Sequence, residues 1–324
     1  MLLSSVAVVA GFILLVWGAD RFVLGASATA RNFGVSPLIV GLTIVGFGTS
    51  APEMLVSGMA AYQGSPGISI GNALGSNITN IALVLGVTAL IVPLTVHSDI
   101  LRRELPILLL VMVLALLLLV DGDLSRGDGL FLLLGMFLMI FWIVRLGLRE
   151  RNSGDLMSSE FDAEIPEGMP MPRAILWLVI GMIVLFASSH ILVWGAVNIA
   201  KAFGVSDLVI GLTIIAIGTS LPELAAAVMS ALKNEHELAL GNVIGSNMFN
   251  ILGVMALPGL IYPAAVPDGV LSRDYPVMLG LTVALLLMAY GFRGRDGKIN
   301  RIEGGLLVTA YLGYLFWLYL AAVK

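Results

Sequence analysis

The chain has 324 residues, of which 59% are hydrophobic and 12% are charged, with a mean hydropathy of +1.01 and a net charge of −4. Soluble domains carry about a quarter charged residues, so this composition excludes a water-soluble globular fold. It predicts an all-α polytopic membrane protein. The lack of Cys excludes thiolate metal ligands and disulfides, and the scattered basic residues give no indication of nucleic-acid binding.

Apolar runs long enough to cross a bilayer recur along the whole chain. A spanning helix needs about 20 apolar residues, and segments rich in charged or turn-forming residues, such as Arg31-Asn32, separate the runs. We expect ten transmembrane helices, of which the fourth is short. The expected spans are 2–20, 37–62, 68–92, 105–120, 129–147, 173–200, 207–232, 238–262, 275–292 and 304–323.

The sequence repeats itself at a fixed offset of 170 residues. Residues 33–53 and 203–223 share 14 of 21 positions, and without a gap the same offset aligns residues 71–80 with 241–250. Each half holds five of the expected spans, so matching helices cross the bilayer in opposite directions. This predicts two inverted-topology five-helix repeats, an architecture of many secondary transporters.

Three regions follow from this repeat. The first five-helix repeat occupies 1–148, an acidic cytoplasmic linker 149–172, and the second, inverted repeat 173–324. Basic residues concentrate on the cytoplasmic side of membrane proteins. With both termini on the exterior, or periplasmic, side of a cell (inner) membrane, all but four of the 17 Lys and Arg residues lie at cytoplasmic ends or loops; the four are Arg126, Lys201, Arg273 and Lys324.

Two acidic residues lie inside apolar spans, each after a proline. Glu53 closes the motif GTSAPE (48–53), and Glu223 closes GTSLPE (218–223). A carboxylate near the bilayer centre costs several kcal/mol and is a functional candidate by default. No Lys or Arg lies in another mid-membrane segment, so we expect a mobile cation to supply the missing charge. Proline removes a helical hydrogen bond, which frees the carbonyls of Gly48 and Gly218.

A second pair of motifs carries polar side chains along one helix face. Asn72, Ser76 and Asn80 are spaced by four residues, and Asn242, Ser246 and Asn250 repeat the pattern. These stripes are either ligands or hydrogen bonds between helices. The glycine pairs Gly71/Gly75 and Gly241/Gly245 are expected to let helix backbones pack closely.

Together these groups form a site of oxygen ligands only. Oxygen ligands suit Ca²⁺, which takes 6–8 of them, better than softer metals; Na⁺ also fits, and H⁺ can neutralise the same carboxylates. Two carboxylates balance one Ca²⁺ or two monovalent cations. Because unbalanced charge is disfavoured in a low dielectric, the two kinds of ion should exclude one another, which is the physical basis of antiport.

In these motifs the sequence resembles the calcium/cation antiporter superfamily, specifically the sodium/calcium exchanger type and its bacterial inner-membrane relatives. The resemblance covers nearly the whole chain. It implies a ten-helix fold in which the long first and sixth helices slide to switch access. It also implies that Glu53 and Glu223 bind Ca²⁺, and that further oxygen ligands and central amides complete the site: Thr49, Thr219, Ser50, Ser220, Ser76, Ser246, Asn80 and Asn250. Asn250, where some relatives carry Asp, argues against K⁺ co-transport.

The expected function is therefore exchange of Ca²⁺ for Na⁺ by alternating access, with transported cations and lipid as the partners and no cofactor. Three alternatives stay open. The first is coupling to H⁺, which His190 or its aligned residue Asp20 could assist. The second is a cation channel. The third is an intramembrane enzyme that uses Ser50 or Ser220, for which the sequence offers no base within plausible reach.

Overall fold

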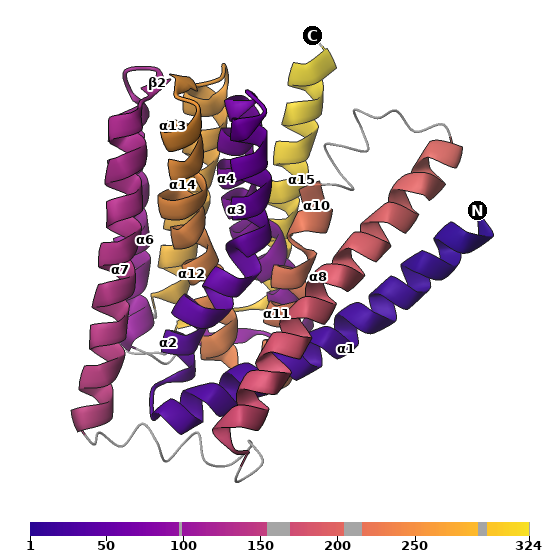
Figure 1. Ribbon diagram of the computed structural model, residues 1–324, viewed down its shortest axis with the longest axis vertical. Helices are drawn as coiled ribbons and strands as arrows, with labels where there is room; N and C mark the ends of the chain where they lie inside the picture. Colours follow the sequence, from indigo (N-terminus) through magenta and orange to yellow (C-terminus); the bar gives the residue numbers. More distant parts are fainter. Residues whose placement is uncertain (97–98, 154–168, 204–215, 291–296, 324) are drawn as a thin grey trace.

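The computed structural model describes residues 1–96, 99–153, 169–203, 216–290 and 297–323. Helices dominate this part of the chain (Figure 1). The first half contains α1 (Leu2–Phe33), α2 (Pro37–Val40), η1 (Gly41–Val45), α3 (Gly46–Tyr62), α4 (Pro66–Thr79), η2 (Asn80–Leu85), α5 (Gly86–Ile91), β1 (Leu94–Val96), α6 (Asp99–Leu119), β2 (Asp123–Leu124) and α7 (Arg126–Ser153).

The second half contains α8 (Met171–Ala202), α10 (Ala216–Thr219), α11 (Leu221–Leu232), α12 (His236–Phe249), η6 (Asn250–Val254), α13 (Ala256–Ile261), β3 (Ala264–Ala265), η7 (Val270–Asp274), α14 (Tyr275–Ala289), β4 (Gly297–Ile299) and α15 (Arg301–Val323). The η segments are π-helical turns. Most of the expected linker, 154–168, and most of the expected start of the seventh span, 204–215, lie outside the described residues.

Eight helical stretches of the described chain are long and apolar enough to cross a membrane. They are Leu2–Phe33, Pro37–Tyr62, Pro66–Ile91, Arg126–Arg145, Met171–Ala202, His236–Ile261, Val270–Ala289 and Arg301–Ala321. Two shorter apolar helices, Glu104–Leu119 and Leu221–Leu232, lie where the fourth and seventh spans were expected.

The first helix is much longer than the expected span 2–20, because it continues to Phe33. Asp20 does not end it, since its carboxylate lies 2.7 Å from the Lys233 ammonium. Arg21 stacks over the rings of Trp17 and Trp177, which lets its charge stay within the helix. The helix ends only at Gly34, whose φ of 65° is the left-handed conformation that glycine adopts readily.

Helices α1 and α8 form an antiparallel pair that leans away from the remaining helices (Figure 1). Each has 32 residues, which gives a length of about 48 Å, and a helix longer than the ~30 Å apolar layer must tilt. Along the pair, Gly11 meets Leu192, Gly18 meets Val184 and Gly25 meets Leu178. Residue numbers along these contacts increase on α1 while they decrease on α8, so the two helices run in opposite directions.

Two short antiparallel strand pairs depart from the expected all-α fold. Strand β1 pairs with β4, and β2 pairs with β3, so each pair joins one half of the chain to the other. They stay short because they only close the gaps between helix ends. Strands β1 and β3 are equivalent under the 170-residue offset, since Leu94 of β1 corresponds to Ala264 of β3.

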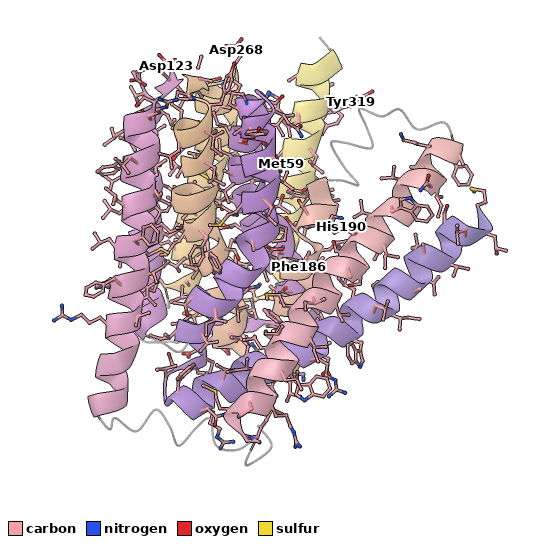
Figure 2. The ribbon with its side chains drawn as sticks, viewed as in Figure 1. Met59, Asp123, Phe186, His190, Asp268 and Tyr319 are labelled. Atoms are coloured by element: carbon pink, nitrogen blue, oxygen red, sulfur yellow. The ribbon has the colours of Figure 1, made fainter. Side chains whose placement is uncertain are left out.

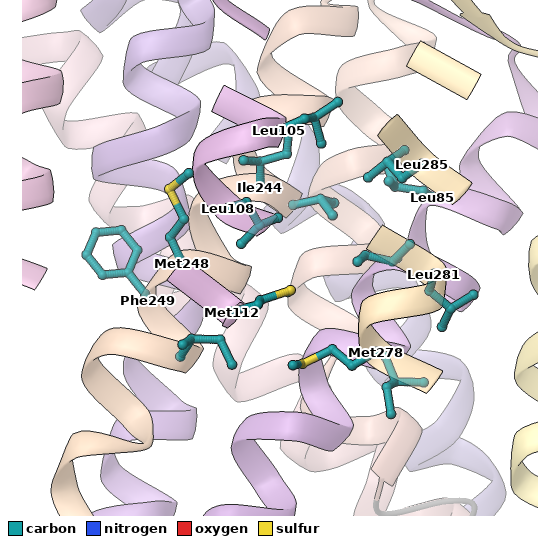
Figure 3. Close-up of a cluster of buried hydrophobic side chains, with 14 of the residues drawn as sticks. Leu85, Leu105, Leu108, Met112, Ile244, Met248, Phe249, Met278, Leu281 and Leu285 are labelled. Atoms are coloured by element: carbon teal, nitrogen blue, oxygen red, sulfur yellow. The ribbon is translucent and has the colours of Figure 1, made fainter. Parts of the chain in front are cut away.

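The apolar core lies among the upright helices. Leu85, Leu108, Ile244 and Met278 are fully buried there, from η2, α6, α12 and α14 (Figure 3). By contrast, α7 and α15 expose large apolar side chains such as Phe137 and Trp317. A protein with a packed apolar core and apolar side chains on its outer surface is suited to a lipid environment.

Close backbone contact joins the segment 37–46 to α12. A Cβ atom added at Gly245 would lie 2.6 Å from the Leu42 carbonyl oxygen, and one at Gly241 would lie 2.8 Å from that of Leu38. The packing role expected of these two glycines is confirmed. The corresponding partners of Gly71 and Gly75, at 208 and 212, lie outside the described residues.

This contact predicts a stability difference between two Gly→Ala substitutions. Gly245→Ala should lower the Tm of the detergent-purified protein by roughly 2–10 °C, because overpacking forces backbones apart. Gly313→Ala on α15 is the matched control, since no described atom lies within 4 Å of its added Cβ; its Tm should stay within about 2 °C. Equal Tm values for the two variants would contradict the close contact.

Candidate functional site

Each of the two acidic residues of the repeated motifs directly follows a proline. Pro52 is inside α3, one residue before Glu53. Pro222 is in the first turn of α11, one residue before Glu223, and Ser220 caps the start of that helix. Both glutamates are 1% exposed. The two copies of one motif therefore deliver one buried carboxylate each, from the interior of α3 and from the start of α11.

The two carboxylates lie near enough for the charge of Glu53 to act on Glu223. Both side-chain oxygens of Glu53 and the Oε2 atom of Glu223 are buried without a hydrogen-bond partner. Within the described residues no Lys or Arg pairs with either acid. A buried charge without a partner is strongly disfavoured, so the two acids are candidates to take up a cation or a proton.

Hydroxyl groups tie the first motif to the helix of the other half. The Thr49 Oγ1 atom lies 3.1 Å from the Asn242 Oδ1 atom and 3.0 Å from the Ser246 Oγ atom. Thr49 also hydrogen-bonds Glu223. The Ser50 hydroxyl lies 3.5 Å from the Ser246 carbonyl oxygen. Residues almost 200 positions apart thus meet in one cluster.

Several oxygen atoms converge in this cluster. Thr49 and Ser246 each bring one hydroxyl hydrogen. The acceptors in reach of these two hydroxyls include the Asn242 Oδ1 atom and the Gly46 carbonyl oxygen 3.4 Å away. Oxygens gathered in this way are the kind of ligand that a hard cation takes.

The second motif has a different set of contacts. The Ser189 hydroxyl of α8 donates to the Gly218 carbonyl oxygen at 2.7 Å, so the carbonyl that Pro222 frees has a partner in this conformation. The Ser220 hydroxyl is 2% exposed and has no partner. Thr219 is half-buried. At the offset, Ser189 corresponds to Ala19, so the first half has no equivalent donor.

The residues of the two polar stripes differ in whether they form hydrogen bonds between helices or leave oxygens free as candidate ligands. Asn72 holds helices together, because its Nδ2 atom donates to the Glu53 carbonyl oxygen at 3.2 Å and to the Ser57 hydroxyl at 3.0 Å. Asn80 and Asn250 instead leave their Oδ1 atoms buried and without a partner. Ser76 is buried beside them, 6% exposed.

Sequence analysis missed a residue that contacts Asn80, together with its counterpart in the other half of the chain. Asn77 and Asn247 are fully buried, and the Asn247 Oδ1 atom accepts a hydrogen bond from the Asn80 Nδ2 atom at 3.2 Å. Both close the repeated GNALGSN and GNVIGSN motifs. That repetition was the available signal, but their spacing places them off the stripe of Asn72, Ser76 and Asn80.

An apolar groove of about 750 Å³ lies beside the cluster, between α7 and the segment 33–47. The rings of Phe47 and Phe249 line it and pack edge to face, with their centres 5.5 Å apart. Apart from the Thr43 hydroxyl, apolar side chains line the groove, so it offers few ligands for a cation.

Away from the cluster, the candidates for proton coupling are separated from it and from one another. Asp20 pairs with Lys233 and lies 3.5 Å from Arg21. His190 is exposed on α8, where Figure 2 shows it on the leaning pair of helices. No group of three His, Asp or Glu side chains gathers in the part of the chain that the structure describes. The site thus combines two acids with neutral oxygens.

Comparison with known proteins agrees with this arrangement. The sequence model of the sodium/calcium exchanger protein family matches residues 3–145 and 173–320. The chain is 50% identical to CaxA of Alkalimonas amylolytica, covering 98% of this chain and 99% of the relative. It is 44% identical to the inner membrane protein YrbG of Escherichia coli K12, covering 98% of each.

A solved structure shows the same fold. The sodium-calcium exchanger NCX_Mj superimposes with a TM-score of 0.82 at 34% identity, over 100% of this chain and 99% of that one. The family match and the matches to the relatives extend across both halves of this chain. The residues that match the family include its two glutamate motifs. The chain therefore belongs to the sodium/calcium exchanger family of membrane proteins.

Proposed function

We propose that this protein is a secondary active antiporter that exchanges Ca²⁺ for Na⁺ at the site of Glu53 and Glu223. The observation that carries the proposal is the pair of buried carboxylates with no basic partner in the described chain. Membership of an exchanger family supports transport rather than enzymatic chemistry. The protein needs no cofactor, because the transported ions supply the missing charge.

Charge balance explains why two kinds of ion compete for this site. Two carboxylates neutralise one Ca²⁺ or two Na⁺, and a site that holds both would carry an excess charge in a low dielectric. Ca²⁺ takes 6–8 oxygens in a flexible shell. Besides the two acids, the ligands that we propose are the hydroxyl and amide oxygens of Thr49, Thr219, Ser50, Ser220, Ser76, Ser246, Asn80 and Asn250.

Sodium is the proposed coupling ion, and H⁺ is the alternative. The NCX_Mj structure, which matches nearly end to end, is named a sodium-calcium exchanger. Asp20, which could have carried a proton, is held in an ion pair with Lys233. The Na⁺ assignment therefore rests on the relatives, because His190 is exposed and the two carboxylates of the site can themselves take up H⁺.

We further propose ten membrane spans in two inverted repeats. Eight long apolar helices and two shorter ones correspond to the ten expected spans. The equivalent helices α1 and α8 run in opposite directions, and strands β1 and β3 correspond at the same offset. Alternating access would then move the α1–α8 pair against the other helices, as the family resemblance implies.

The protein is a membrane protein, and we propose the inner membrane with both termini outside. The name of the relative YrbG supports the inner membrane. The asymmetry of Lys and Arg supports the orientation. Asp123 and Asp268 lie at the same end of the molecule as the C-terminus (Figure 2), as expected if that end faces outward.

Replacing either acid should abolish exchange. Glu53→Gln and Glu223→Gln each remove one negative charge, so bound Ca²⁺ would leave an uncompensated positive charge in the bundle. Uptake of ⁴⁵Ca²⁺ into Na⁺-loaded proteoliposomes should fall more than about 100-fold. Glu303→Gln at the start of α15 is the matched control and should transport normally. Normal exchange by a Glu53→Gln/Glu223→Gln double variant would refute the site.

The same vesicles identify the coupling ion. An outward Na⁺ gradient should drive ⁴⁵Ca²⁺ uptake, whereas K⁺ or H⁺ gradients of equal size should not. The reason is that an antiporter releases Ca²⁺ on one side and carries the counter-ion through the same site in the opposite direction. Uptake driven by H⁺ alone would replace the Na⁺ assignment with the H⁺ alternative. Uptake that needs no counter-ion would indicate a channel.

The natural absence of Cys makes the orientation directly measurable. Single Cys residues at Asp123 and Asp268, both exposed, should react with a membrane-impermeant maleimide added to spheroplasts. A Cys at Lys298, exposed on β4, should react only after the membrane is permeabilised. The opposite labelling pattern would reverse the proposed orientation.

A further inference from the structure

One hydrogen bond connects a proposed ligand to a residue that has no assigned role. Asn80, the first residue of η2, donates from its Nδ2 atom to the Oδ1 atom of Asn247 on α12, at 3.2 Å. Asn80 is 1% exposed and Asn247 is fully buried. The bond crosses from the first half of the chain to the second, 167 residues away.

The bond determines which way the Asn80 amide points. An Asn side chain carries a donor and an acceptor on opposite branches of one planar group. When the donor branch is held by Asn247, the oxygen must point to the other side. The Asn80 Oδ1 atom is buried there without a partner, as are the side-chain oxygens of Glu53.

The opposite arrangement of the two amides would pair just as many of their groups. If both amides turned over, the Asn247 Nδ2 atom, which has no partner here, would donate to the Asn80 oxygen. One bond would still join them, and one donor and one acceptor would still lack partners. Only the observed arrangement keeps the Asn80 oxygen available, because in the opposite one that oxygen is occupied by the bond.

The other half of the chain has no matching bond. At the 170-residue offset, Asn77 corresponds to Asn247 and Asn250 to Asn80. The Asn77 Nδ2 atom lies 3.6 Å from the Met278 sulfur, a weak acceptor, and Figure 3 shows Met278 within the apolar cluster. Among the described residues, the Oδ1 atoms of both Asn77 and Asn250 lack partners.

We propose that Asn247 is a positioning residue that holds the Asn80 carbonyl oxygen toward the transported cation. The proposal rests on the proposed function, in which Asn80 is a ligand. Asn247 does not need to touch the ion, because its oxygen acts through the Asn80 amide. The role is specific to one half of the repeat: Asn80 is fixed, whereas Asn250 is not fixed by its own counterpart Asn77.

Transport kinetics of Asn247 variants test this role. Asn247→Ala should raise the KM for Ca²⁺ about 3- to 10-fold, the range for one buried hydrogen bond, and leave the maximal rate within about twofold. Asn77→Ala is the matched control at the equivalent position and should leave the KM for Ca²⁺ unchanged.

A double-variant cycle separates positioning from general packing. If Asn247 acts through Asn80, Asn247→Ala should add nothing to the KM of an Asn80→Ala protein, because contacting residues are non-additive. Additive effects, an equal effect of Asn77→Ala, or a normal KM in Asn247→Ala would each overturn the proposal. If the alanine variant does not fold, Asn247→Ser, too short to reach Asn80, replaces it in the same comparison.

The Glu53→Gln and Glu223→Gln variants distinguish the two proposals. If both lose exchange while Asn247→Ala behaves normally, the antiport site stands and only the positioning role fails. If both exchange normally, the antiport site itself is wrong, and the kinetics of Asn247 no longer bear on a cation ligand.

Discussion

Two negative charges in an apolar helical bundle, without a positive charge from the described chain, are the constraint on which this structure depends. Glu53 and Glu223 are almost completely buried, and most of their oxygens have no hydrogen-bond partner. Such a pair destabilises the empty protein. In the proposed antiport the same instability favours ion binding, because a bound cation would lower the free energy of a group that the described chain leaves unsatisfied.

The backbone packing around the acids serves this constraint. Gly41 and Gly46 of the first half lie against Leu238 and Gly245 of α12, with backbone atoms in contact. Any larger residue there would separate the two helices. Their closeness lets short side chains such as Thr49 reach across to the other half. Hydroxyls that end on short side chains are held firmly, which a site for small ions requires.

Local pattern and the internal repeat predicted most of the apolar helices and singled out the two acids that the structure buries, because these are visible within short motifs. Long-range pairing was not visible. The sequence places Asp20 at the end of a span, whereas its partner Lys233, which lets the helix continue, lies 213 residues away. The strands β1 to β4 are only two or three residues long and pair between halves. The bond from Asn80 to Asn247 also depends on how the halves meet, so no motif alone predicts it.

The antiparallel contact of α1 and α8 restricts how these helices can move. A Cβ atom at Gly25 or Gly181 would collide with the backbone of Leu178 or Phe22, so neither helix can shift along the other without separating from it. The two must travel together as one rigid arm. The ion pair from Asp20 to Lys233 links this arm to α11, and its side chains are about one-third exposed. Exposed ion pairs contribute about 0–1 kcal/mol, so in the alternating access that we propose this link would break and re-form at low energetic cost.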